Sequence, residues 1–294
     1  MRRSILLLCA AAACSASQLR LRGGAPPVWK DLVKAPAVLD SGYSTDNKLE
    51  ITSKSGLNGG IGLKTTFLRN AADKISSTFK ATTSYQGVDI EANLDGSGTI
   101  KGEAKADVSG VKLTLGGSLK GGSSIKDMPA PSVAAEYSKG DLTCNARVEG
   151  KNLEAGAVFQ AGDVQVGGFA TYDSSAGTLG DPTIAATYNG GNFKASAVVN
   201  GLKGDDVQAT YTQSINSDLD VAGTFSTNGN KFALGASYKV DAGSSVKGKI
   251  NSDGILNLGY KREVDKGSVL NAGFQVDTNN VDDRHFGISL AMST

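Results

Sequence analysis

The chain has 294 residues, enough for one large domain or two ordinary ones, and it contains 38 Gly but only 6 Pro, 1 His and 1 Trp. Its formal net charge of +1 excludes a strongly basic nucleic-acid-binding protein, and residues 25–294 alone carry −3 because the four arginines of residues 1–24 are not matched by any acid there. Only Cys144 follows residue 24, which excludes a disulfide framework, and no apolar run reaches the roughly 18 residues of a membrane-spanning helix.

Residues 1–24 have the pattern of a leader or presequence. Two arginines precede the short apolar run ILLLCAAAAC, and small residues follow it. Three interpretations stay open: an export leader, which could be the first half of a two-part plastid address; an acid-free organelle presequence; or an upstream start that is not used.

Residues 25–42 predict a short, imperfect amphipathic helix followed by a hinge. Pro26 and Pro27 suit a helix start, and Pro36 should break or kink the helix. Apolar and charged side chains fall on different sides: Trp29, Leu32 and Val33 on one, and Lys30, Asp31 and Lys34 on another. A short amphipathic segment of this kind is typical of an arm that packs on a domain surface.

From residue 47 onward, segments of about ten residues alternate apolar and polar side chains and end in turn residues. In TIKGEAKADV (99–108), Ile100, Ala104 and Val108 share one face, and Lys101 and Lys105 lie on the other. Period-two alternation predicts strands with one apolar and one wet face. We count nineteen strands, starting near residues 47, 57, 74, 87, 98, 110, 131, 141, 151, 162, 182, 191, 205, 217, 230, 244, 254, 267 and 284. Their short connections predict an antiparallel meander in a single domain.

The apolar faces favour an all-β membrane barrel over a sandwich. They are rich in Ala, Gly, Val and Thr, whereas a sandwich core should favour large side chains. Strands of nine to eleven residues match a tilted bilayer crossing, and a closed barrel leaves no unpaired edge in lipid. We therefore predict a single transmembrane β-barrel over residues 43–294, wide enough for an aqueous lumen.

Four segments resemble the voltage-dependent anion channel family, the eukaryotic porins of mitochondria. Residues 238–260, YKVDAGSSVKGKINSDGILNLGY, are similar to the family signature, and PPVWKDLVK (26–34) resembles its amino-terminal helix. GVKLTL (110–115) resembles a motif associated with nucleotide binding, and HFGISLAM (285–292) is similar to the sorting signal of mitochondrial outer-membrane barrels. Nineteen strands is already the known number for mitochondrial members of this family, so our strand count is not independent of it.

The resemblance implies a voltage-gated, weakly anion-selective channel of the mitochondrial outer membrane for ions and small metabolites, including nucleotides. It places the amino-terminal helix in the pore as a gating element comprising Trp29, Lys30, Asp31, Leu32 and Lys34. Strand phase supplies candidate lumen lysines that would attract phosphate-bearing solutes: Lys101, Lys105, Lys112, Lys120, Lys231, Lys239, Lys247 and Lys249. The sorting-signal residues would be His285, Gly287, Leu290 and Met292.

The expected partners are a lipid bilayer, ions and phosphate-bearing metabolites, the outer-membrane barrel assembly machinery and further copies of the chain, with no nucleic acid. We expect no cofactor, no metal and no enzymatic activity, because the sole histidine, His285, has no catalytic constellation to join. Two other functions stay open, a protein-translocase barrel and a secreted soluble β-protein. The leader likewise leaves a plastid envelope or endomembrane location open.

Overall fold

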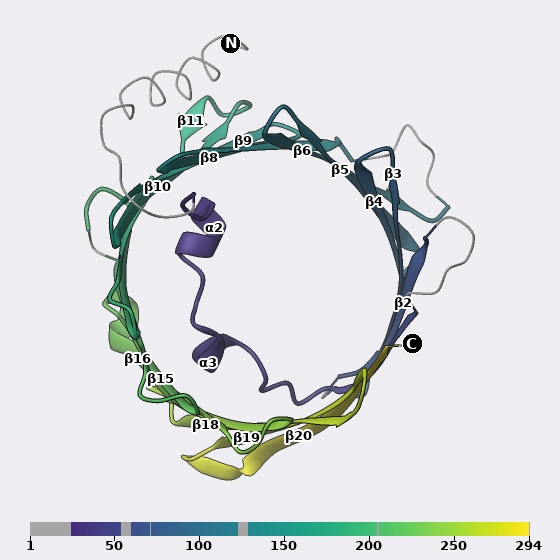
Figure 1. Ribbon diagram of the computed structural model, residues 1–294, viewed down its shortest axis with the longest axis vertical. Helices are drawn as coiled ribbons and strands as arrows, with labels where there is room; N and C mark the ends of the chain where they lie inside the picture. The colour runs from purple at the N-terminus through teal and green to yellow at the C-terminus, as the bar shows by residue number, and fades with distance from the viewer. Residues whose placement is uncertain (1–24, 54–59, 71, 123–128, 205, 294) are drawn as a thin grey trace.

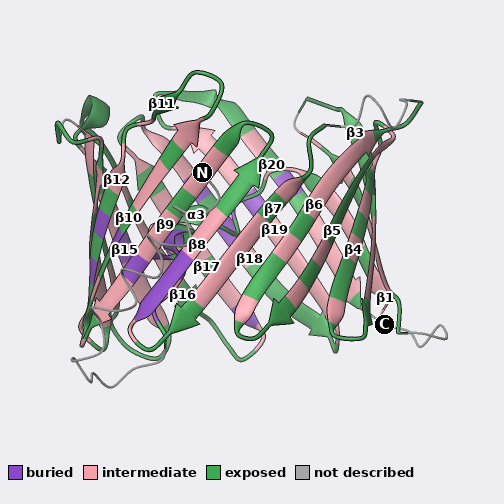
Figure 2. Ribbon diagram, turned by 90° about the horizontal axis from the view of Figure 1, so that it is seen from above, coloured by how far each residue is buried: buried purple, intermediate pink, exposed green. Residues whose placement is uncertain are grey.

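The computed structural model describes residues 25–53, 60–70, 72–122, 129–204 and 206–293, and these form a closed β-barrel with an arm inside it (Figure 1). Nineteen strands close the ring, each hydrogen-bonded to two neighbours, and β11 pairs only with the end of β10. The strands cross the barrel at a tilt (Figure 2). The predicted nineteen-strand barrel is confirmed, and the predicted leader lies outside the described residues.

The strand bounds agree closely with the sequence pattern, and all but two predicted starts fall within two residues of the observed ones. The exceptions are β2, which begins at Gly62, and β20, which begins at Asn280. The strands are β1 (Asn47–Ser53), β2 (Gly62–Arg69), β3 (Ile75–Tyr85), β4 (Val88–Asp95), β5 (Thr99–Val108), β6 (Val111–Lys120), β7 (Ser132–Lys139), β8 (Leu142–Glu149), β9 (Asn152–Ala161), β10 (Val164–Asp173), β11 (Thr178–Leu179), β12 (Thr183–Asn189), β13 (Phe193–Asn200), β14 (Asp206–Ser214), β15 (Leu219–Ser226), β16 (Lys231–Lys239), β17 (Ser244–Asn251), β18 (Ile255–Asp265), β19 (Ser268–Asp277) and β20 (Asn280–Ser293).

Tight turns join most successive strands. Between β5 and β6, Ser109 (φ 56°) and Gly110 (φ 82°) both adopt positive φ, as a two-residue hairpin turn of type I′ requires. A 3₁₀ turn, η2 (Asn228–Asn230), lies between β15 and β16. Successive strands of the ring pair antiparallel, as the predicted meander requires.

The barrel closes through one parallel pair, which the predicted antiparallel meander did not include. β1 runs parallel to β20, with Lys48 opposite Ser289 and Met292 opposite Ile51. A ring of strands that alternate in direction can close fully antiparallel only if their number is even. An odd number, nineteen, therefore requires one parallel seam.

The register separates an apolar outer face from a polar inner face. From β8 to β17, no outward position carries a charged side chain. Large apolar side chains such as Leu115 and Leu234 are each 56% exposed on that outer face. A soluble protein would not expose so continuous an apolar surface, so the outer face is built for lipid.

Two short helices lie inside the ring, α2 (Trp29–Leu32) and α3 (Ala37–Asp40) (Figure 1). The helical segment is broken, as the sequence led us to expect at Pro36: α2 ends at Leu32, and Pro36, with an extended ψ of 140°, is the N-cap residue of α3. The described residues include no helix that is long and apolar enough to cross a membrane. We call residues 25–46 the arm; it includes both helices and leads directly into β1.

Candidate functional site

The polar, lumen-facing wall of the barrel and the arm that lies on it form the candidate site. Pairing across the strands places all eight predicted lysines on this wall: Lys101, Lys105, Lys112, Lys120, Lys231, Lys239, Lys247 and Lys249. Successive side chains of a strand point to opposite faces, and each of these lysines occupies a position that points into the barrel. Their surroundings differ from one strand to the next.

Acidic side chains accompany the lysines of β5 and β6. Lys105 Nζ lies 3.1 Å from Glu103, and Lys112 Nζ lies 3.5 Å from Glu136 across the β6–β7 pair. The side chains of Lys105 and Lys112 are 52% and 68% exposed to the lumen. Pairs this exposed contribute little stability but offset much of the positive charge on that side of the wall.

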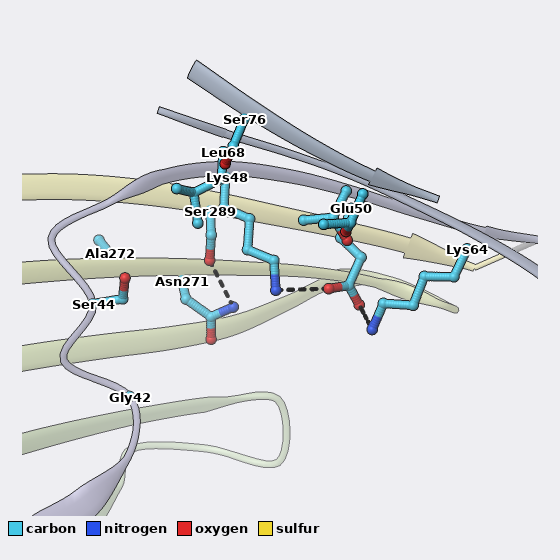
Figure 3. A pocket seen from close by; sticks show the side chains of 12 residues that line it. Gly42, Ser44, Lys48, Glu50, Lys64, Leu68, Ser76, Asn271, Ala272 and Ser289 are labelled. Atoms are coloured by element: carbon cyan, nitrogen blue, oxygen red, sulfur yellow. Dashed lines mark hydrogen bonds and ion pairs between the residues drawn. The ribbon is translucent and has the colours of Figure 1, made fainter. Parts of the chain in front are cut away.

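A cavity of about 640 Å³ lies at the parallel seam and contains a carboxylate held by two lysines (Figure 3). Glu50 accepts from Lys48 Nζ at 2.7 Å on one oxygen and from Lys64 Nζ at 2.7 Å on the other. Asn271 donates to Ser289 at 3.3 Å beside them. The three charged side chains leave one net positive charge here. Our predicted site did not include them, although the phase of strands β1 and β2 places them inward.

Helix α2 packs its apolar side on the wall formed by β9, β10 and β12. The Trp29 ring stacks on Phe169, with ring centroids 5.8 Å apart and planes 8° apart. Leu32 is 1% exposed and packs against Val158 and Ala185. This placement agrees with the predicted apolar side of the helix.

The charged side of α2 faces the lumen. Lys30, Asp31 and Lys34 are all exposed, whereas Pro26 is held at the wall, where Thr143 donates a 2.6 Å hydrogen bond to its carbonyl. The arm carries two lysines and three aspartates in total. It is therefore a nearly neutral body with separated charges.

Helix α3 is held by side chains that donate hydrogen bonds to its backbone carbonyls. Lys247 donates to Ala37 O at 3.3 Å, and Lys249 donates to Leu39 O at 2.9 Å. Tyr43 donates to the Val38 carbonyl, and Lys249 lies 4.7 Å from the Tyr43 ring centroid. Cations at a helix carboxyl end also complement the helix dipole.

Lys247 and Lys249 thus contact the arm as well as the lumen. Burial raises the pKa of Tyr43, so its hydroxyl stays a neutral donor. The sequence predicted these two lysines as attractors of solutes and gave no sign of the contact with α3. The only feature of the sequence that singled out this segment was its similarity to the family signature, and that similarity does not indicate which residues the segment contacts.

The predicted sorting segment forms part of β20. Leu290 and Met292 point outward, and His285 and Gly287 point inward, as the pairing with β19 shows. His285 Nε2 lies 3.0 Å from Asp283. Gly287 lies directly beneath the backbone at Thr45 and Asp46 of the arm.

The described part of the chain contains no group of three or more His, Cys, Asp or Glu side chains placed to hold a metal ion. The charged groups of the site instead pair with one another, contact the arm or face the lumen. This arrangement presents charged side chains of both signs to the lumen.

Known proteins resemble the chain along almost its whole length. The family model described as "Eukaryotic porin" matches residues 25–287. The chain is 25% identical over 290 residues to "Mitochondrial outer membrane protein porin 2" of Arabidopsis thaliana, covering 91% of this chain and 98% of that protein. It is 26% identical over 271 residues to "Voltage-dependent anion-selective channel" of Drosophila melanogaster, covering 87% and 94%.

A third relative carries a different description of selectivity. "Non-selective voltage-gated ion channel VDAC2" of Homo sapiens is 24% identical over 285 residues, covering 91% of this chain and 94% of that protein. Among solved structures, an engineered Rh. blastica porin matches with a TM-score of 0.47 and 11% identity, covering 84% of this chain and 96% of that chain. That structural likeness is too distant to support a conclusion.

Proposed function

The chain belongs to the eukaryotic porin family, and from that premise we propose that it forms a voltage-gated channel through which ions and small metabolites, including nucleotides, diffuse passively. The observation that carries the proposal is the closed barrel, apolar outside and charged inside, whose arm lies along the wall (Figure 1). Such a barrel gives solutes a wet path through a bilayer. We propose no catalytic step, because diffusion needs none.

We propose weak preference for anions. Lys105, Lys112, Lys48 and Lys64 are each accompanied by a carboxylate, which reduces their pull on solutes. The wall of β16 and β17 is richer in lysine, with Lys231, Lys239, Lys247 and Lys249. The names of the relatives differ on this point, one being called anion-selective and another non-selective.

We propose that Lys112 and the other inner-wall lysines attract the phosphate groups of nucleotides. Lys112 is 68% exposed, so a solute can reach it despite Glu136. A lysine presents a mobile point charge, suited to brief contacts along a path of diffusion. The support here is the placement of the lysines and the motif resemblance at residues 110–115.

We place the channel in the mitochondrial outer membrane. The support is the name of the Arabidopsis relative and the inward and outward alternation of His285, Gly287, Leu290 and Met292 on β20. We propose that the barrel assembly machinery of that membrane recognises β20, and that copies of the chain associate there. A plastid envelope or endomembrane would be the alternative if residues 1–24 direct the chain elsewhere.

The two other functions have less support. A secreted soluble protein would not carry large apolar side chains across its outer face. A translocase barrel would share the fold, but the relatives described above are named as a porin or as channels. The porin function therefore accounts for more of the observations.

Release of solutes from vesicles tests the proposed function. The full-length chain is inserted into liposomes loaded with ATP, chloride and a high-molecular-weight dextran. We expect ATP and chloride to leave while the dextran stays. Retention of ATP by vesicles that demonstrably contain folded barrel would contradict the proposal.

A further inference from the structure

Three glycines on neighbouring strands form a row on the inner wall beneath the arm. Gly259 of β18 pairs with Gly273 of β19, which in turn pairs with Gly287 of β20. All three face the lumen. After α3 the arm crosses the wall directly over this row as it runs toward β1.

The row lets the arm backbone touch the wall backbone. A Cβ on Gly259 would overlap the Gly42 carbonyl, and a Cβ on Gly273 would overlap the Ser44 carbonyl. A Cβ on Gly287 would overlap the carbonyl group of Thr45. Because every obstructed atom is backbone, no side-chain rotation could relieve the overlap, and the arm would have to rise from the wall.

Glycines beneath the two helices are different. A Cβ on Gly235 would meet Leu39 Cδ2 at 2.8 Å, and one on Gly167 would meet Leu32 Cδ2 at 2.9 Å. These nearest atoms of the arm are the ends of flexible side chains, which can move aside. The next neighbours, Gly248 O at 3.1 Å and Ala157 O at 3.0 Å, belong to the wall itself and not to the arm. Among these positions, the glycine row under residues 42–46 is therefore where an added side chain would displace the arm most.

Contacts at both ends hold the arm down on the row. Lys247 and Lys249 fix the carboxyl end of α3, just before residue 42. At the other end, the Ile288 amide donates to Asn47 Oδ1 at 3.1 Å, one residue along β20 from Gly287. The backbone between is clamped against the row.

We propose that Gly259, Gly273 and Gly287 are positioning residues that seat the arm, and that leaving this seat is part of channel closure. The inference rests on the proposed function for its second half only. It also gives Gly287 a role apart from sorting. A glycine at that position is needed for the arm to lie flat, whether or not an assembly factor reads it.

The test compares Gly273→Ala with Gly168→Ala in the full-length chain. Gly168 lies on β10 and faces outward, and among the described residues only the Thr183 carbonyl oxygen, at 4.0 Å, would come near a Cβ at that position. Two readouts are recorded: acrylamide quenching of Trp29, the sole tryptophan, and the fraction of channels closed at a fixed voltage in planar bilayers. Overpacking of this kind should shift the docked and undocked populations by about tenfold or more.

We expect Gly273→Ala to raise both Trp29 quenching and closure, and Gly168→Ala to change neither. Unchanged quenching in Gly273→Ala would overturn the seat, even if closure shifted. Raised quenching with unchanged closure would leave the seat standing and contradict arm-driven gating, so the two failures are distinguishable. If Gly273→Ala does not fold, Gly259→Ala is measured by the same criteria.

Gly287→Ala separates seating from sorting. The protein is refolded from denaturant into detergent, which bypasses any cellular assembly factor. We expect the same rise in Trp29 quenching as in Gly273→Ala. Quenching equal to the wild-type value in this refolded variant would overturn the role of Gly287 in the seat.

Discussion

At the residue scale, lysines with the same strand phase serve different purposes. Lys249 donates to Leu39 O at 2.9 Å and lies over the Tyr43 ring, while Lys239, on the next strand, is exposed. Alternation places a side chain on a face but does not say what covers that face. Only the path of the arm distinguishes these two lysines.

We predict that Lys249→Met loosens the arm. The change removes a charged hydrogen bond and a cation–π contact, together worth about 2 kcal/mol for a half-buried group. Trp29 quenching should rise, and channels should close at lower voltage. The measurement is the acrylamide quenching constant in liposomes.

Lys239→Met is the matched control. It removes the same charge from the same part of the wall without touching the arm. It should lower anion preference, measured as the reversal potential in a salt gradient, and leave Trp29 quenching alone. Equal quenching in the two variants would show that Lys249 acts through charge and not through contact with α3.

At the element scale, the arm is a strap with two short anchors. Helices of four residues have no stability of their own, so α2 and α3 depend on packing against the wall. Trp29 and Leu32 anchor α2, and Val38 and Leu39 anchor α3 near Ala222. Such a strap depends on all of its contacts with the wall, and it can detach while the barrel stays closed.

Deleting residues 26–40 should abolish or alter voltage-dependent closure while leaving an open, conducting barrel. The deletion removes both anchors and no strand. Channel closure is measured in planar bilayers against the full-length chain. If closure stayed unchanged in the deletion, the gating element would have to lie elsewhere.

We predict that a substitution to lysine destabilises the barrel on the outer face of β6 and has little effect on its inner face. Leu115 points outward and is 56% exposed, whereas Thr114 points into the lumen. Leu115→Lys should lower the free energy of unfolding by about 2–4 kcal/mol, the cost of a lysine near the bilayer midplane. Thr114→Lys should change it by less than about 1 kcal/mol, because the lumen hydrates the charge.

Denaturant unfolding in liposomes measures both variants. Equal destabilisation would mean that the assigned faces of β6 are wrong. The comparison therefore tests the register of the wall, on which the placement of every lumen lysine depends.

At the scale of the whole molecule, the local sequence pattern predicted the barrel, whereas contacts between distant segments could be seen only in the structure. Most strand starts and the facing of residues such as Lys101 and Ile100 follow from alternation within ten residues. The parallel seam, the Glu50 cavity and the row under Ser44 depend on segments that are distant in sequence. Gly273 and Gly287 look like ordinary strand glycines until the arm is seen above them.

The most direct test of the channel is a planar-bilayer recording of the full-length chain under rising voltage. We predict stepwise conductance, weak preference for anions and a fall in conductance as the voltage increases. Absence of conductance, or firm cation selectivity, would contradict the account.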